Sequence, residues 1–248
     1  MTQTNDIKFS VIIPAYNEEQ FLPRLLDSIE VARSNYSGGH ESIEVIVANN
    51  QSTDRTEEVA AAHGARVVSV KKRRIAAARN GGGHAAGGDI VCFIDADSAV
   101  HPQTFEAIDK AIESGRYVAG STGLKLERKS LGLLVTYCVA ALFVWLTRMD
   151  AGVIFCRRED FQSVGGYDES RLYAEDLVFL MDLRRLGKKR GQRLTRLTQV
   201  KALGCTRKFD QFGDWHYFWM LGHAIKSLIT WNWNDEKLAD RYWYKSRR

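Results

Sequence analysis

The sequence has few cysteines, and none follows the C-x-x-C spacing of metal or redox sites. The four lie at positions 92, 138, 156 and 205. Cys92 and Cys156 stand in apolar runs, where a free cysteine behaves as a small hydrophobic residue. With 248 residues, 45% of them hydrophobic, the chain can bury one large core without help from disulfides or metals. We therefore expect one globular domain with appendages, in a reducing compartment.

The given sequence also shows no leader pattern and no long apolar run. Its first residues, MTQTNDIKFS, show no succession of basic, apolar and small residues, which predicts a cytoplasmic protein rather than a secreted one. The uncharged stretch 131–147, between Lys129 and Arg148, is shorter than the roughly 20 apolar residues that a membrane-spanning helix needs. We expect this stretch to form a buried or interfacial helix.

No charged segment has the features of a nucleic-acid-binding module. The net charge of +5 and the pI near 9.0 suit an anionic partner, such as nucleic acid, an acidic membrane surface or a phosphorylated ligand. The basic runs at 71–74, 188–190 and 245–248 are scattered, and stacking aromatics are not interleaved with them. We expect solvated helix faces and loops there, and no nucleic acid as partner.

What the chain does contain is an alternation of strand and helix patterns. Short apolar runs typical of strands occur at residues 9–14, 43–48, 65–70, 90–94 and 116–121. Helix patterns separate them, as in the three- and four-residue apolar spacing from Phe21 to Ile29 and the capping pattern of Asp54 and Glu57. The IAAARN stretch and the residues after Pro102 also favour helices. This order predicts an α/β fold with a mainly parallel, twisted sheet and helices on both faces.

Polar segments follow three of the predicted strands, at 15–18, 49–52 and 95–98. In open α/β sheets, ligands bind outside the carboxyl ends of the strands. We therefore expect these three segments to line one shared crevice.

Two carboxylates, Asp95 and Asp97, come directly after the strand at 90–94. Carboxylates so close together repel each other and favour a divalent cation. Mg²⁺ or Mn²⁺ accepts oxygen ligands from one or two carboxylates plus substrate phosphates. The alternative is a simple strand-end turn, because Asp and Ser are common there.

Five segments occur in an order and spacing that resemble family 2 glycosyltransferases: PAYNEE (14–19), NNQSTDRT (49–56), ARNGGGHAAGGDIVCFIDADS (78–98), GGYDE (165–169) and AEDLVFLMDLRRLGKK (174–189). Five ordered motifs, covering residues 8–190, are more specific than any one of them. The resemblance implies the Rossmann-like GT-A fold and transfer of a sugar from a nucleoside diphosphate, usually with inversion. Residues 1–205 would form the transferase domain, with a nucleotide-binding half at 8–100 and an acceptor-side half at 101–205. A basic, aromatic, helical tail would follow at 206–248.

The resemblance also implies which residues contact the nucleotide sugar: Pro14, Ala15, Tyr16, Glu18, Asn49, Arg79, Asn80, Asp95, Ala96, Asp97, Gly165, Gly166 and Arg207. Some have structural alternatives: Pro14 can end the strand, Glu18 can cap a helix, and Arg79 can be solvated at the surface. Asn49 departs from the family pattern, which usually has Asp. Its amide can accept and also donate a hydrogen bond, so the base that it contacts stays open.

For the chemistry, the resemblance implies that Asp176 is the catalytic base, with Glu175 as the alternative. An acceptor hydroxyl is a poor nucleophile until a base takes its proton. Both residues also open a helix, where acidic side chains are favoured without any catalytic role. Metal ligands for Mn²⁺ or Mg²⁺ would be Asp97, Asp95 and His216, although a lone histidine in DWHYFW also fits a packed interfacial residue. The cation would stabilise the leaving diphosphate, with Arg207 closing over it.

Other functions compete with this interpretation. GGGHAA fits a dinucleotide-binding fingerprint, but a helix pattern precedes it and a strand follows, the reverse of the required order. A nucleotidyltransferase would need a glycine-rich loop directly after the first strand, where PAYNEE stands. A non-catalytic protein with a decayed transferase fold is the third alternative, and only the Asn49 departure favours it.

The predicted partners follow from the leading interpretation. We expect a UDP or GDP sugar as donor and a lipid-linked or glycan acceptor. The aromatic and basic segment 212–233 fits peripheral contact with the inner face of the cell membrane. It fits packing against its own domain or a second subunit equally well, because amphipathicity does not separate the two.

Overall fold

The computed structural model describes residues 7–128 and 149–215, together with residues 130, 132, 133, 135, 136, 144 and 147 between those ranges. Most of the apolar stretch 131–147 and everything from His216 onward lie outside the described residues. The predictions made for those segments therefore stay predictions. Within the described part of the chain, no helix is both long and apolar enough to cross a membrane.

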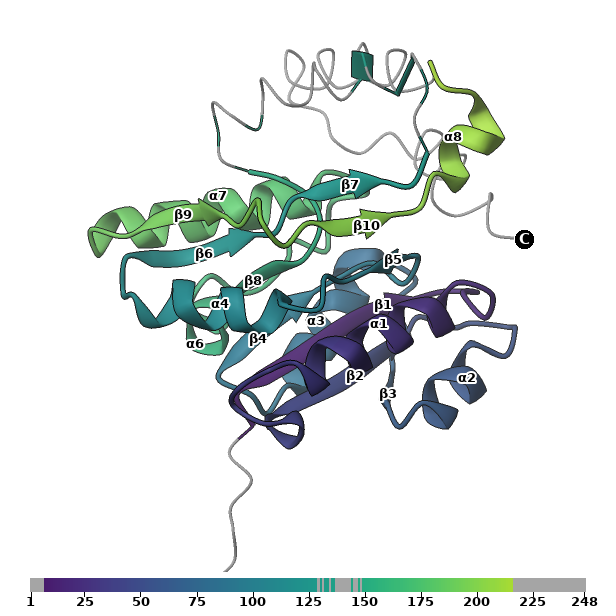
Figure 1. Cartoon of the computed structure of the whole chain (residues 1–248), viewed down its shortest axis with the longest axis horizontal. Coiled ribbons are helices and arrows are strands. Elements are labelled where there is room, and N and C mark those ends of the chain that lie inside the picture. Colours follow the sequence, from purple (N-terminus) through teal and green to yellow (C-terminus); the bar gives the residue numbers. More distant parts are fainter. Residues whose placement is uncertain are drawn as a thin grey trace, which may run out of the picture.

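A seven-stranded sheet in the order β3-β2-β1-β4-β8-β6-β9 forms the centre of the molecule (Figure 1). Its strands are β1 (Phe9–Ala15), β2 (Ile43–Asn49), β3 (Arg66–Ser69), β4 (Ile90–Phe93), β6 (Tyr117–Ser121), β8 (Ile154–Arg157) and β9 (Arg193–Arg196). Every pairing is parallel except those of β8, which runs antiparallel to both β4 and β6. The prediction of a mainly parallel sheet is confirmed.

A small second sheet lies beside the carboxyl end of β4, in the order β5-β10-β7 (Figure 1). It contains β5 (Ser98–Ala99), β10 (Ala202–Gly204) and β7 (Leu124–Leu126). β5 follows Asp97 directly, and Gly204 of β10 pairs with Ser98. This pairing brings the residues after β10 next to the loop that carries the two aspartates.

Helices cover both faces of the large sheet, as predicted. α1 (Leu22–Ser34), α2 (Thr56–Ala62) and α4 (Thr104–Glu113) contribute to one buried cluster, whereas α3 (Ile75–Ala85), α6 (Arg158–Ser163) and α7 (Glu175–Lys189) contribute to the other. β1 supplies both clusters by alternation, since Val11 and Ile13 face the first and Ile12 the second. The 3-10 helix η1 (His40–Ser42) and α8 (Arg207–Phe212) are short helical elements outside these two groups.

α3 is longer than the sequence predicts, because it continues through the glycines instead of ending at Asn80. Glycine in a helix interior costs about 1 kcal/mol relative to alanine. A Cβ on Gly82 would overlap the side chain of Ile12 in β1, and a Cβ on Gly83 would come within 2.6 Å of the Phe161 ring. The glycines therefore let α3 approach β1 and α6 closely.

α2 also begins differently from the prediction. Arg55, not Asp54, precedes the first helical residue. Asp54 instead accepts hydrogen bonds from the backbone N–H of Thr56 (3.0 Å) and of Glu19 (3.1 Å). It thus links the turn after β2 to the turn after β1.

Candidate functional site

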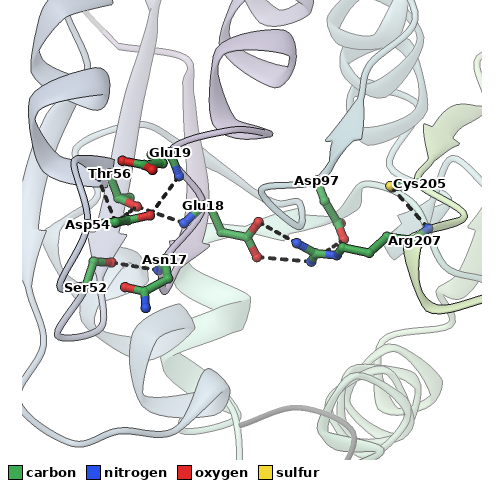
Figure 2. A network of polar contacts seen from close by, with 9 residues as sticks. All are labelled: Asn17, Glu18, Glu19, Ser52, Asp54, Thr56, Asp97, Cys205 and Arg207. Carbon is green, nitrogen blue, oxygen red and sulfur yellow. Dashed lines mark hydrogen bonds and ion pairs between the residues drawn. The ribbon is translucent and has the colours of Figure 1, made fainter. Parts of the chain in front are cut away.

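The loops after β1, β2 and β4 meet at the carboxyl ends of these strands, as the sequence predicts. The backbone N–H of Asn17 donates to the Ser52 hydroxyl (3.1 Å), and the backbone N–H of Thr53 donates to Asn17 Oδ1 (2.8 Å). These contacts join the first two loops (Figure 2). An arginine joins the first loop to the third.

That arginine is Arg207, at the start of α8. Its Nη1 and Nη2 donate to the two oxygens of Glu18 (3.1 and 3.2 Å), and Nη2 also donates to Asp97 Oδ2 (2.8 Å) (Figure 2). Glu18 is only 1% exposed. Burial lowers the pKa of Arg207, but the hydrogen bond and charge of Glu18 and the charge of Asp97 outweigh it, so the pKa is raised. Arg207 therefore neutralises two carboxylates that the resemblance assigns to the nucleotide sugar and the cation.

A second buried arginine, Arg79 of α3, holds three more carboxylates. Its Nη1 lies 2.6 Å from Glu175 Oε1 and 2.9 Å from Asp176 Oδ1, while Nη2 lies 2.8 Å from Asp95 Oδ1. The surface alternative for Arg79 is wrong, because the residue is 3% exposed. Arg79 thus joins the Asp95 loop to the start of α7.

Asn80, the next residue of α3, holds the GGYDE segment. Its Oδ1 accepts from the backbone N–H of Tyr167 (2.8 Å), and its Nδ2 donates to the Tyr167 carbonyl (2.9 Å). Gly165 and Gly166 have φ of +80° and +72°, which side chains disfavour, and a Cβ on Gly166 would lie 2.5 Å from Asn80 Oδ1. The structure gives the two glycines a local role in closing this turn, and their contact with a nucleotide stays a prediction.

Asp176 combines an enclosed oxygen with an open one. Its Oδ1 is buried and makes no hydrogen bond, only the ion pair with Arg79, whereas the side chain as a whole is 38% exposed. Burial raises the pKa of Asp176 to about 7, against the Arg79 charge, with the charges of Glu175 and Asp95 adding to the rise. A carboxyl group with such a pKa can accept a proton at neutral pH and release it again.

Asn49 and Asn50 are tied into the loop after β2. Asn49 Oδ1 accepts from the backbone N–H of Ser52 (3.0 Å), and its Nδ2 donates to Glu57 (2.9 Å). Asn50 Nδ2 donates to the carbonyls of Val70 (3.2 Å) and Lys72 (2.7 Å). Both asparagines therefore have turn-stabilising roles, and contact between Asn49 and a base stays a prediction.

The other nucleotide candidates differ in what they can offer. Pro14 and Ala15 end β1 and are buried, and Ala96 belongs to the hydrophobic cluster under α1 and α4. Tyr16 is half-buried, with the Arg73 guanidinium 4.1 Å from its ring centroid. Only Tyr16 of these offers a polar side chain.

One feature of the site that sequence reasoning missed is backbone strain. Asn17, Gln51 and Ala174 adopt left-handed φ values of 52°, 65° and 58°, although none is glycine. Each lies in a loop that carries candidate residues, and strained backbone clusters at functional sites. For Gln51 the sequence held a signal, because Asn49-Asn50-Gln51-Ser52 stands where family 2 glycosyltransferases usually have Asp-Asp-Gly-Ser or Asp-Asn-Gly-Ser, with glycine at the third position.

The carboxylates fit a cation that arrives with a diphosphate. Within the described residues, no group of three His, Cys, Asp or Glu side chains is placed to hold a metal ion by itself. Asp95 and Asp97 are 54% and 21% exposed, and each is ion-paired with an arginine. Two carboxylates suffice for Mg²⁺ or Mn²⁺ when phosphates supply further oxygens. The third predicted ligand, His216, lies outside the described residues.

Comparison with known sequences agrees with this site. The model of the family "Glycosyl transferase family 2" matches residues 10–128. An undecaprenyl-phosphate 4-deoxy-4-formamido-L-arabinose transferase of Aeromonas hydrophila is 35% identical over 121 residues, 47% of this chain and 37% of the relative. A dolichyl-phosphate beta-glucosyltransferase of Drosophila melanogaster is 35% identical over 117 residues, 43% of this chain and 36% of the relative. The match thus takes in little more than a third of each relative.

Solved structures share the fold over more of the chain. A fragment of TarS from S. aureus, residues 1–349, superposes with a TM-score of 0.62 at 20% identity, covering 81% of this chain and 61% of that fragment. Glucosyl-3-phosphoglycerate synthase from Mycobacterium tuberculosis, solved with Mn²⁺ and UDP, superposes with a TM-score of 0.56 at 26% identity, covering 77% of this chain and 70% of that enzyme. The chain has the GT-A fold, and its residues 10–128 match the model of glycosyl transferase family 2.

Proposed function

We propose that the chain transfers a sugar from a nucleoside diphosphate sugar to an acceptor hydroxyl, with inversion and with a divalent cation. The observation that carries the proposal is the position of Arg79 between Asp95 and Asp176. Arg79 thus holds two carboxyl groups at the same edge of the sheet. Asp95 is suited to the leaving-group side, and Asp176 is suited to proton removal. The match of residues 10–128 to the glycosyl transferase family 2 model supports the same reaction class.

Asp176 is the proposed base. Its pKa of about 7 leaves a substantial ionised fraction at neutral pH, and Oδ2 is the oxygen that is not enclosed. The acceptor proton passes to this oxygen as the acceptor oxygen bonds to the anomeric carbon and the bond to the diphosphate breaks. A phosphate acceptor is already ionised and needs no such base. The raised pKa therefore favours a hydroxyl as the nucleophile.

On the leaving-group side, Asp97 and Asp95, with His216, are the proposed ligands of Mn²⁺ or Mg²⁺. When bound, the cation would stabilise the negative charge that develops on the diphosphate. Arg207 would add a positive charge from the protein beside the diphosphate. Its guanidinium now donates to Asp97 and would donate to a phosphate oxygen instead when the donor binds. Glu18 anchors Arg207 from the β1 side.

The names of similar proteins support particular classes of donor and acceptor. TarS has been solved with UDP-GlcNAc, and a mannosyltransferase from Pyrobaculum calidifontis with GDP-Man and Mn²⁺. Two relatives are named for undecaprenyl phosphate and dolichyl phosphate. We propose a UDP or GDP sugar as donor and a lipid-linked or glycan acceptor whose nucleophile is a hydroxyl, unlike the lipid phosphates for which those two relatives are named. A cytoplasmic location at the inner face of the membrane, with contact through residues 131–147 and 212–233, is part of the same proposal.

Isothermal titration with UDP, GDP and dTDP, with and without Mn²⁺, tests the proposal. We expect one nucleotide to bind, more tightly with Mn²⁺, and Asp97→Asn to remove the effect of Mn²⁺. The matched control Asp182→Asn changes an aspartate on α7 that pairs with Arg185, and should bind like the wild type. Absence of binding in every titration contradicts the proposal. Binding without turnover of any donor sugar would indicate a non-catalytic protein.

A further inference from the structure

Tyr167 carries a buried hydroxyl that the proposed mechanism does not use. The residue is 2% exposed, and its ring stacks on Phe179 (4.1 Å between centroids) and meets Phe93 edge-on (5.0 Å). Within the described part of the chain, the hydroxyl has no hydrogen-bond partner. Buried tyrosine hydroxyls usually find one, so an unpartnered hydroxyl in a packed aromatic cluster needs an explanation.

The charged groups around this hydroxyl belong to the candidate site. Burial raises the pKa of Tyr167 well above its usual value, and the negative charge of Asp176 raises it further, against the charge of Arg79. The Arg79 guanidinium lies 5.2 Å from the centre of the Tyr167 ring. Tyr167 therefore lies among the same side chains that surround the proposed base.

Asp176 also has a buried oxygen without a hydrogen bond. Its Oδ1 is as enclosed as the Tyr167 hydroxyl and likewise lacks a hydrogen bond. The hydroxyl is near enough to Asp176 to lower the pKa of this carboxyl as a donor, although the two oxygens do not complete a hydrogen bond in this structure. Arg79 links the two groups in space, because its guanidinium pairs with Oδ1 of Asp176 (2.9 Å) and also lies over the Tyr167 ring (5.2 Å).

We propose that Tyr167 is a positioning residue for Asp176, whose hydroxyl donates to Oδ1 of the ionised carboxylate and leaves Oδ2 directed at the acceptor. This inference rests on the proposed function, in which Asp176 takes the acceptor proton. Arg79 contacts the same Oδ1 from α3. Two donors on one oxygen fix the carboxylate plane and reserve the other oxygen for the proton.

Other charged groups also act on Asp176, and the test must separate them from Tyr167. They are Arg79 from α3, Glu175 from the same turn of α7, and Asp95 from the loop after β4. Tyr167→Phe changes none of these groups and keeps the ring that packs on Phe179. Because it removes a buried hydroxyl without a full hydrogen bond, we expect the melting temperature to stay the same or rise slightly.

The first experiment titrates Asp176 directly. NMR of the carboxyl carbons in protein labelled at aspartate gives the pH midpoint of each aspartate titration. The signal that is absent from Asp176→Asn belongs to Asp176. We expect Tyr167→Phe to raise the midpoint by about half to one pH unit, the size of one hydrogen bond. Tyr36→Phe is the matched control, because the Tyr36 hydroxyl also donates to an aspartate, Asp109, in the other hydrophobic cluster. An Asp176 midpoint that is unchanged or lower in Tyr167→Phe overturns the proposal.

The second experiment measures donor turnover against pH. For Tyr167→Phe we expect the acidic limb of kcat/KM to move to higher pH, with about three- to tenfold less activity at pH 6 and a smaller loss at pH 9. The donor KM should not change. A uniform loss at every pH would show a structural role and overturn the proposal. Since the NMR titration needs no donor, failure of the proposed function, with no turnover in the wild type, leaves that test intact.

Discussion

Replacing Arg79 by methionine should destabilise the protein strongly at alkaline pH and less at acidic pH. Methionine keeps most of the apolar stem of the arginine but removes the guanidinium. Three carboxylates then lose the contact that neutralises them, namely Asp95, Glu175 and Asp176. No other change in the described site removes so many ion pairs at once.

The magnitude follows from the burial of each partner. Removing one partner of a buried ion pair costs about 3–5 kcal/mol. Glu175 fits that case, with 10% of its side chain exposed, whereas Asp176 and Asp95 are 38% and 54% exposed, so that solvent screens their contacts with the arginine. We therefore expect Arg79→Met to lower the free energy of unfolding by about 2–4 kcal/mol at pH 8.

The pH dependence has a definite sign. The pKa of Asp176 is about 7, and Arg79 lowers it, so the variant should have a still higher value. At pH 5.5 this carboxyl binds a proton in both proteins, and the arginine then has one charge fewer to neutralise. The loss of stability should therefore be smaller at pH 5.5 than at pH 8.

Urea unfolding at both pH values measures this difference, with the slope against urea concentration as the check that the folded state is unchanged. Arg55→Met is the matched control, because Arg55 pairs with Glu58 on the surface, where both side chains are at least 70% exposed. We expect no measurable change for the control. An Arg79→Met protein as stable as the wild type at pH 8, or a loss that grows as the pH falls, would refute the reasoning.

Three further predictions concern the same site. Between pH 3.8 and about 7 the folded wild type binds one more proton, at Asp176, than the unfolded chain, so its stability should fall as the pH rises. Asp176→Asn should remove most of this fall. Thermal unfolding across this pH range measures the difference, and identical pH profiles for the two proteins would contradict the prediction. Gly166→Ala should lower the melting temperature more than Gly165→Ala. A left-handed φ costs a residue with a side chain about 1–2 kcal/mol at either position, but only a Cβ at Gly166 would contact other residues. Equal melting temperatures would show that this contact is unimportant. Arg207→Met should bind Mn²⁺ alone about fivefold more tightly, because Asp97 loses a competing cation; weaker binding would contradict this.

The sequence predicted those strands and helices whose own residues show an apolar pattern. β1 and β2 are apolar runs, and α1 buries Leu22, Leu25 and Ile29 at the expected spacing. β9 and β10 carry no such pattern, since Arg193–Arg196 has only one apolar residue between its two arginines, and Ala202–Gly204 has only three residues. These strands form because β6 and the small second sheet provide partners, and such long-range pairing is not visible in a local window.

The same limit applies to the site. The motifs pointed to Asp95, Asp97 and Asp176. They also pointed to Arg79 and Arg207, but not to the carboxylates that these two arginines contact. Arg79 and Glu175 are 96 residues apart, and Arg207 and Glu18 are 189 apart. An arginine at a helix surface and one in a buried ion-pair network look alike in sequence, because only the fold determines which carboxylates surround them.

The central claim is that Asp176 takes the acceptor proton at a site that binds a nucleoside diphosphate sugar. Its most direct test compares binding and turnover of UDP and GDP sugars with Mn²⁺ for the wild type, Asp176→Asn and Glu175→Gln. We predict that Asp176→Asn binds the donor as the wild type does but turns it over on the order of 100-fold more slowly, with a smaller loss for Glu175→Gln. Turnover by Asp176→Asn at the wild-type rate would contradict the account.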